Sequence, residues 1–122
     1  MLDHLGIQVR DPAVSAAFYD AVLAPLGGKR MQQYGDVIGY GVDHPDFWIS
    51  PIDSTGNARE AHIAFVAPSR AAVQAFHDAA LKLGAEVLHL PKLWPEYHPT
   101  YFGVFIRDPD GHNVEAVCHA PE

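Results

Sequence analysis

Glu115 is the residue of this sequence whose surroundings most need an explanation. It lies between apolar residues in the stretch Asn113-Val-Glu-Ala-Val117, which directly follows the turn sequence Asp108-Pro-Asp-Gly. That turn chemistry predicts a hairpin between a strand at 101–107 and a strand at 113–117. A carboxylate inside such a strand faces either water or the interior, and an interior carboxylate requires a cation, a metal or a proton.

Two histidines occupy equivalent positions in an apparent internal repeat. An offset of 58 residues, the separation of His4 from His62, aligns four further identities in register (Phe18, Asp20, Ala21 and Leu23 with Phe76, Asp78, Ala79 and Leu81). Because equivalent positions of duplicated modules converge around a pseudo-twofold axis, the two imidazoles could approach one point, with Glu115 as a third group. Two imidazoles and a carboxylate suit ferrous iron, zinc or manganese. The alternative is two histidines that hydrogen-bond the backbone and a surface glutamate.

A second group of reactive side chains lies in and beside the loop predicted for residues 91–100. Tyr97, His98 and Tyr101 could donate protons or bind an oxyanion, and we take His98 and Tyr97 as the candidate acid–base residues. In the alternative interpretation, Trp94 and the tyrosines cover a sheet edge while His98 faces water.

Aromatic residues near these positions are candidates for substrate contact. We assign Phe47, Trp48 and Tyr101 to that role, while core packing explains such rings equally well. Cys118 is expected to be buried and inert. The other histidines are expected to be structural or exposed, with His44 and His112 in solvent, His77 on a helix surface, His89 at a strand margin and His119 near the terminus.

The composition bounds the kind of protein. A chain of 122 residues with 48% apolar content is expected to form one compact domain, and its formal net charge of −7 argues against a nucleic-acid partner. The single cysteine excludes an intrachain disulfide and suits a reducing compartment. The chain has neither a secretory signal pattern nor an apolar run long enough for a membrane helix. We therefore expect a soluble, cytoplasmic protein.

Hydrophobic periodicity and turn residues predict an α+β fold made of two βαβββ units. The first has strands at 3–9, 29–34, 37–42 and 46–52, and its helix begins at Asp11-Pro12 and ends at Gly27-Gly28. The second has strands at 61–67, 85–90, 101–107 and 113–117, and its helix runs from a Ser69 cap to Gly84. A polar linker at 53–60 separates a first module of residues 1–57 from a second of residues 58–122.

These residues resemble the vicinal oxygen chelate superfamily, which includes glyoxalase I, extradiol dioxygenases, fosfomycin-resistance thiol transferases and bleomycin-binding proteins. The resemblance spans nearly the whole chain and is most specific in Asp108-Pro-Asp-Gly-His-Asn-Val-Glu115. It implies paired βαβββ modules that curl into a half-open sheet around a central cavity, with a metal held by His4, His62 and Glu115. It also implies a homodimer in which each site is shared between two chains.

One departure from the glyoxalase pattern matters. Glyoxalase I supplies a fourth ligand, a carboxylate or a glutamine, from the last strand of the first module, and here that strand contains neither Glu nor Gln. Asp46 lies too early in it, and Ser50 is a poor base. The departure disfavours lactoylglutathione lyase activity and favours dioxygenase-like or thiol-transferase-like chemistry.

We therefore expect a metal-dependent dioxygenase, lyase or thiol transferase that stabilises negative charge on two neighbouring oxygens of a small substrate. Three ligands leave zinc, iron, manganese and nickel open. Two other functions stay open as well. One is a non-catalytic, bleomycin-resistance-like protein whose cavity binds an apolar or aromatic molecule, and the other is a structural dimerisation module.

Overall fold

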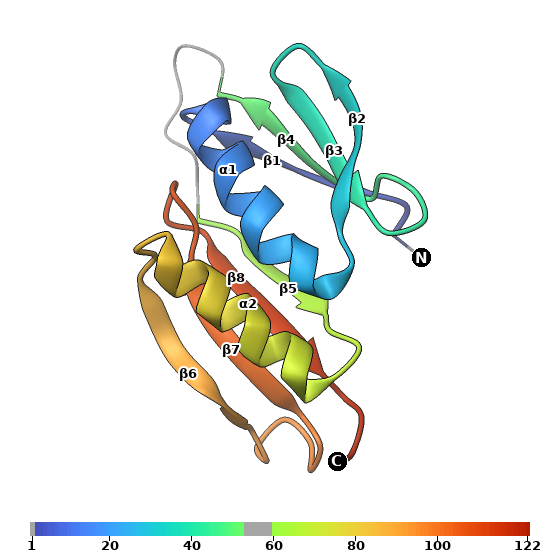
Figure 1. Ribbon diagram of the computed structural model, residues 1–122, viewed down its shortest axis with the longest axis vertical. Helices are drawn as coiled ribbons and strands as arrows, with labels where there is room; N and C mark the ends of the chain where they lie inside the picture. The colour runs from blue at the N-terminus through green and yellow to red at the C-terminus, as the bar shows by residue number, and fades with distance from the viewer. Residues whose placement is uncertain (1, 53–59) are drawn as a thin grey trace.

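The computed structural model describes residues 2–52 and 60–122, which form the two predicted βαβββ modules (Figure 1). The first module consists of β1 (Leu5–Val9), α1 (Pro12–Leu23), a 3₁₀ turn (Ala24–Leu26), β2 (Lys29–Tyr34), β3 (Val37–Gly41) and β4 (Phe47–Pro51). The second consists of β5 (His62–Val66), α2 (Arg70–Lys82), β6 (Val87–Leu93), β7 (Phe102–Arg107) and β8 (Asn113–Cys118). The predicted α+β fold is confirmed.

Each module forms one four-stranded sheet, and the two sheets have the same topology. The strand orders are β1-β4-β3-β2 and β5-β8-β7-β6, so β1 and β5 are end strands. In both sheets the first and last strands pair in parallel, and the remaining pairs are antiparallel. The register repeats too, because Gly6 lies opposite Trp48 as Ala64 lies opposite Glu115. Among the described strands, no backbone pairing joins the two sheets within one chain.

Local signals fix the helix ends as predicted. Asp11 accepts hydrogen bonds of 3.1 and 3.3 Å from two backbone N–H groups in the first turn of α1. Ser69 caps α2 in the same way with a bond of 3.1 Å. Gly27 and Gly84 follow the two helical segments with φ angles of 87° and 72°, which glycine adopts without strain.

The two helices lie side by side and cover the same side of the sheets, so the modules share one apolar core (Figure 1). Phe47 on β4 packs edge-on against Phe65 on β5 with ring centroids 5.0 Å apart, which extends the core across both modules. Because side chains alternate along a strand, Trp48 on β4 and Glu115 on β8 lie on the sheet faces that point away from the helices. The largest fully buried side chains are Tyr19, Tyr40, Phe76, Ile49 and Ile106.

The structure departs from the predicted elements at β6. The sequence predicts a strand at 85–90 and a loop from Pro91, whereas β6 continues to Leu93. The pairing of β6 with β7 is irregular between His89 and Lys92, where Pro91 lies. Proline has no backbone N–H group to donate, and a strand tolerates it at such an irregularity. The predicted module boundary, and all of the predicted 53–60 linker except Glu60, lie outside the described residues. Within the described ranges, no helix is both long and apolar enough to cross a membrane.

Candidate functional site

His62 and Glu115 meet on the outer face of the second sheet. Ala64 lies opposite Glu115 across the parallel β5–β8 pair, and His62, two residues earlier, points to the same side. The Nε2 atom of His62 lies 3.2 Å from Oε1 of Glu115. The Glu115 side chain is only 2% exposed, whereas that of His62 is 51% exposed. Glu115 is therefore an interior carboxylate whose partner is a half-exposed imidazole.

Tyr101 and Gly103 complete the surroundings of this carboxylate. The Tyr101 hydroxyl donates a hydrogen bond to Oε2 of Glu115. Burial, together with that hydrogen bond, raises the pKa of the Tyr101 hydroxyl above its usual range, so the phenol stays a donor. A Cβ on Gly103 would lie 3.2 Å from Oε2 of Glu115, so glycine keeps space beside the carboxylate. Gly103 is not among the site residues predicted from the sequence, although a glycine inside a strand often marks a close approach of another group to the backbone.

The loop after β6 lies beside this site and is fixed by its own contacts. The backbone N–H of Trp94 donates to the carbonyl of Tyr101 at 2.8 Å, and its indole Nε1 donates to the carbonyl of Gly103 at 3.1 Å. Tyr97 is exposed and packs edge-on against Tyr101 with centroids 5.0 Å apart. Tyr97 and Tyr101 are therefore neighbours.

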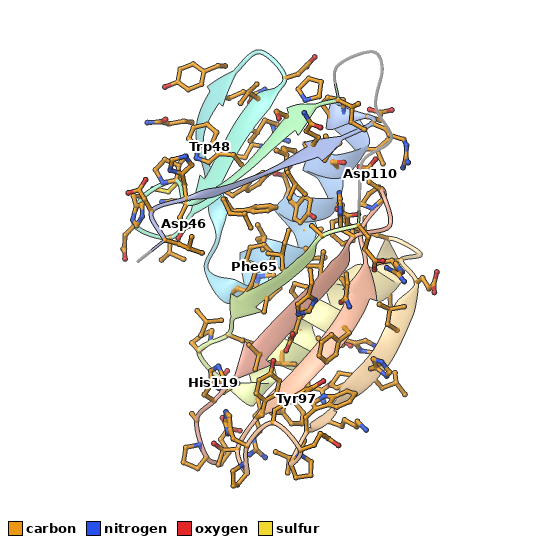
Figure 2. The ribbon with its side chains drawn as sticks, turned by 180° about the vertical axis from the view of Figure 1, so that it is seen from behind. Asp46, Trp48, Phe65, Tyr97, Asp110 and His119 are labelled. Carbon is orange, nitrogen blue, oxygen red and sulfur yellow. The ribbon has the colours of Figure 1, made fainter. Side chains whose placement is uncertain are left out.

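His98 forms a short hydrogen-bonded pair with His119. Nε2 of His98 lies 2.7 Å from Nδ1 of His119. The backbone N–H of Thr100 donates to Nδ1 of His98 at 3.1 Å, so Nδ1 is the acceptor nitrogen of this ring. Nε2 of His98 therefore carries the hydrogen and donates the hydrogen bond to Nδ1 of His119. The ring of Tyr101 packs edge-on against both imidazoles at 5.3 Å. Figure 2 shows His119 and Tyr97 at the same end of the second module, so His119 joins the candidate acid–base residues.

His4 and Trp48 face outward from the first sheet. Nδ1 of the exposed His4 lies 2.7 Å from Oδ2 of Asp3, and this hydrogen bond lowers the pKa of the Asp3 carboxyl. Phe47 points the other way, is 4% exposed and packs in the core. Of the two aromatic residues assigned to substrate contact on β4, only Trp48 lines a concavity on this face. That concavity has a volume of about 640 Å³, and its other lining residues include His4, Gly6, His44 and Ser50.

The three predicted metal ligands do not come together within one chain. Across residues 2–52 and 60–122, no three His, Cys, Asp or Glu side chains are close enough to hold a metal ion. His62 and Glu115 meet, but His4 lies on the outer face of the other module. The ligand set stays a prediction, and it now depends on a second chain.

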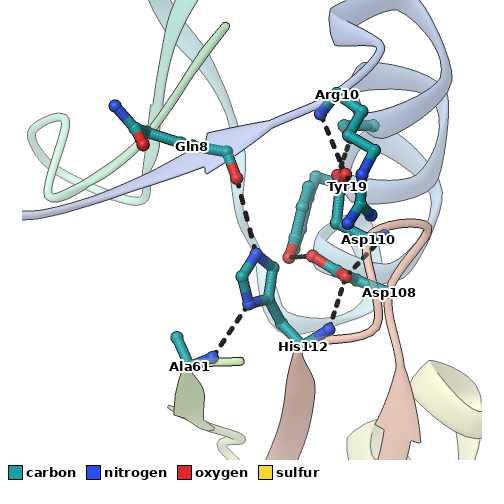
Figure 3. A network of polar contacts seen from close by, with 8 residues as sticks. Gln8, Arg10, Tyr19, Ala61, Asp108, Asp110 and His112 are labelled. Atoms are coloured by element: carbon teal, nitrogen blue, oxygen red, sulfur yellow. Dashed lines mark hydrogen bonds and ion pairs between the residues drawn. The ribbon is translucent and has the colours of Figure 1, made fainter. Parts of the chain in front are cut away.

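His112 is buried, so the expectation that it faces solvent is wrong. Its side chain bridges the two modules, with Nδ1 accepting the backbone N–H of Ala61 at 2.9 Å and Nε2 lying 3.4 Å from the carbonyl of Gln8 (Figure 3). His77 is buried as well and not on the helix surface as expected. Local sequence patterns do not reveal such burial, because it arises from packing between distant segments.

Asp108 and Asp110 tie the turn before β8 to the first module (Figure 3). Asp108 accepts a hydrogen bond of 2.7 Å from the Tyr19 hydroxyl. Burial and the nearby Asp108 carboxylate raise the pKa of Tyr19 well above its usual value. Asp110 accepts from the backbone N–H of Arg10 at 2.9 Å and from the Ser15 hydroxyl at 3.3 Å. The turn predicted to close a hairpin therefore also clamps the modules together.

A larger groove, of about 950 Å³, lies away from these residues. It is bounded by α1, the segment after α2 and the turn at 108–111, and it contains neither His62 nor Glu115. Two of its charged residues, Arg107 and Glu60, form an ion pair with each other. We place the candidate site at His62 and Glu115 because of their chemistry, not because of cavity size.

Comparisons with known proteins agree with the resemblance seen in the sequence. The family model for the Glyoxalase/Bleomycin resistance protein/Dioxygenase superfamily matches residues 1–116. A comparison with curated proteins gave no match.

Several solved structures share the fold over nearly their full length. A glyoxalase/bleomycin resistance protein from Albidiferax ferrireducens T118 is 26% identical, with a TM-score of 0.82 over 94% of this chain and 96% of that one. The fosfomycin resistance protein FosX from Listeria monocytogenes is 18% identical (TM-score 0.72, 98% and 93% covered). Lactoylglutathione lyase from Agrobacterium tumefaciens is 20% identical (TM-score 0.70, 94% and 90% covered). The last two similarities show the fold alone, but the family model spans almost the entire chain, which therefore belongs to the Glyoxalase/Bleomycin resistance protein/Dioxygenase superfamily.

Proposed function

We propose that this chain is a metal-dependent enzyme that acts on a small substrate through two neighbouring oxygen atoms. The observation that carries the proposal is the burial of the Glu115 carboxylate against the half-exposed imidazole of His62. Burying a carboxylate is costly unless a charge compensates it, and the hydrogen bond from the uncharged Tyr101 hydroxyl offsets only part of that cost. We infer that a divalent cation bound by the pair supplies the remaining compensation.

The residues at the site fit such a cation. An imidazole nitrogen and a carboxylate oxygen are suitable ligands for zinc, iron, manganese and nickel, so the donor types do not choose among these metals. His62 Nε2 and Glu115 Oε1 already face each other at 3.2 Å. Gly103 keeps the space beside Glu115 free of a side chain.

A homodimer would supply the missing ligand. β1 and β5 are end strands, and the residues that begin them are Leu5, directly after His4, and His62. Docking the first module of one chain onto the second module of another would place His4 against the His62–Glu115 pair. Each dimer would then contain two sites, each built from both chains.

The chain's own residues have separate roles in this proposal. The bound cation would supply Lewis-acid stabilisation of negative charge on two neighbouring substrate oxygens. Tyr101 holds the Glu115 carboxylate in place through its hydroxyl. His98 and His119 share a proton along their 2.7 Å hydrogen bond and act as the acid–base pair, and the exposed Tyr97 hydrogen-bonds the substrate.

The absence of a carboxylate or glutamine in β4 narrows the reaction type. β4 reads Phe-Trp-Ile-Ser-Pro, so this strand offers no strong base to the site. We therefore favour dioxygenase-like or thiol-transferase-like chemistry over a lactoylglutathione lyase reaction.

Metal analysis of the protein purified without chelators or added metals tests the proposal. The wild-type protein should contain about one divalent ion per chain, and His62→Ala should contain none. His89→Ala, which removes an exposed histidine of β6, is the matched control and should keep the metal. Full occupancy in His62→Ala, or no metal in the wild type, would contradict the proposal.

A non-catalytic binding protein is the second candidate. It is favoured by the finding that the described residues of one chain contain no group of three metal ligands. Metal-free protein that binds an apolar or aromatic molecule with unchanged affinity in His62→Ala would support this candidate instead.

A further inference from the structure

Trp48 occupies in the first module the position that Glu115 occupies in the second. Gly6 pairs with Trp48 and Ala64 pairs with Glu115, and the repeat offset of 58 residues carries Gly6 onto Ala64. The equivalence extends to the histidines, because His4 precedes Gly6 by two residues as His62 precedes Ala64. The first module therefore presents an indole where the second presents a carboxylate.

The residue paired with Trp48 on the adjacent strand also differs from the residue paired with Glu115. Glu115 lies opposite Phe105, whereas Trp48 lies opposite Gly39. The six-membered ring of the indole covers Gly39, since a Cβ there would lie 2.8 Å from Cη2 and Cζ3 of Trp48. The absence of a side chain at this position lets the indole lie against the strand.

The indole is part of a broader aromatic surface. The ring of Tyr34 on β2 is nearly parallel to that of Trp48, with an interplanar angle of 11° and centroids 6.3 Å apart. Trp48 remains partly exposed and borders the concavity that also contains His4 and Ser50. A flat ring resting on Trp48 would thus lie beside His4.

We propose that Trp48 determines substrate specificity by stacking against a planar aromatic ring that bears the two neighbouring oxygens. An indole provides one N–H donor and no acceptor, so it can neither bind a cation as a ligand nor act as a base. It offers a polarisable face, which favours a planar π system over a puckered aliphatic ring. The inference rests on the proposed function, because it names the substrate class of that same site.

Titration calorimetry with a matched pair of probes tests this role. Salicylate is planar and carries neighbouring oxygens, and cis-2-hydroxycyclohexanecarboxylate carries the same groups on a saturated ring. Wild-type protein should bind salicylate about tenfold more tightly than the saturated probe, in keeping with the strength of a single aromatic contact. Trp48→Leu should bind the two probes equally.

Gly39→Ala separates displacement of the indole from its removal. The added methyl group pushes the ring away from the strand while every polar group of the site is kept, so the preference for salicylate should fall in this variant too. Leu81→Ala, which removes an exposed apolar side chain of α2, is the control and should keep the preference. Circular dichroism and urea unfolding show whether each variant is folded.

The outcomes also separate this inference from the proposed function. Equal binding of the two probes by wild type, no measurable binding of salicylate, or an undiminished preference in folded Trp48→Leu would overturn the role of Trp48. Protein that contains no metal but keeps the preference would contradict the metal-dependent function and leave the role of Trp48 standing. Metal-loaded protein without the preference would do the reverse.

Discussion

The hydroxyl of Tyr19 on α1 donates a 2.7 Å hydrogen bond to the carboxylate of Asp108 in the turn before β8, and both residues are buried. This bond joins the helix of the first module to the hairpin that carries Glu115. The relative position of the modules therefore depends on a buried polar contact as well as on the shared apolar core.

Removing that hydroxyl should cost stability. Tyr19→Phe leaves one oxygen of a buried carboxylate without its partner, so we expect the free energy of unfolding in urea to fall by about 1–3 kcal/mol. Tyr34→Phe is the control, because the Tyr34 residue is 65% exposed and its hydroxyl donates to the exposed side chain of Gln32. Its effect should stay below about 0.5 kcal/mol. Equal effects of the two substitutions would show that the Tyr19–Asp108 hydrogen bond adds no more to the free energy of unfolding than an exposed one does.

The same tyrosine predicts how stability changes at alkaline pH. The folded-state pKa of Tyr19 lies well above the unfolded value, chiefly because the phenol is buried. Its contribution is therefore complete below about pH 10 and is lost as the pH rises above that value, at about 1.4 kcal/mol per pH unit for one proton. Urea unfolding between pH 9 and 11 should show a shallower decline in Tyr19→Phe than in wild type. Identical slopes would contradict the prediction.

Two substitutions of the buried His112 should lower stability by different amounts. Its Nδ1 atom accepts the N–H of Ala61, the residue before His62, so it holds the start of β5 in place. His112→Leu removes this acceptor and should destabilise the protein by about 1–3 kcal/mol, whereas the side-chain oxygen of His112→Asn can replace it and should recover part of the loss. Urea unfolding of both variants measures the difference. Equal losses would show that the Ala61 contact is unimportant.

Much of the fold could be predicted from the sequence because its signals are local. Asp11 and Ser69 cap the helices, and Asp108-Pro-Asp-Gly forms the turn before β8, because each of these residues acts through its own backbone neighbourhood. The 58-residue repeat correctly predicted that His4 and His62 lie near the starts of equivalent strands, His4 directly before β1 and His62 at the first residue of β5.

The parts that sequence analysis missed depend on contacts between distant segments. The burial of His112 results from packing against Gln8, 104 residues away. His119 pairs with His98 only because the loop after β6 folds back beside the end of β8. That Trp48 faces outward while Phe47 packs in the core follows from the phase of β4, which a five-residue strand rich in apolar residues does not reveal.

Replacing the Glu115 carboxylate should abolish metal binding and change the stability of the metal-free protein little. In metal-free protein, Glu115→Gln removes a buried charge while its amide can still accept from Tyr101 and contact His62, so stability should stay within about 1 kcal/mol of wild type. The rise in melting temperature produced by added zinc should disappear in this variant, because only a cation bound to the folded state stabilises it. Glu96→Gln, in the loop after β6, is the control and should keep the zinc effect. A Glu115→Gln protein that zinc still stabilises would contradict the ligand role.

The central claim is that His4 of one chain completes a metal site with His62 and Glu115 of another. Metal content of His4→Ala, of His62→Ala and of a mixture of the two refolded together tests it most directly. We predict that each variant alone contains no metal. Random pairing in the mixture should restore one intact site per mixed dimer, or about 0.25 ions per chain. A mixture that stays metal-free, or a His4→Ala protein that keeps its metal, would contradict the account.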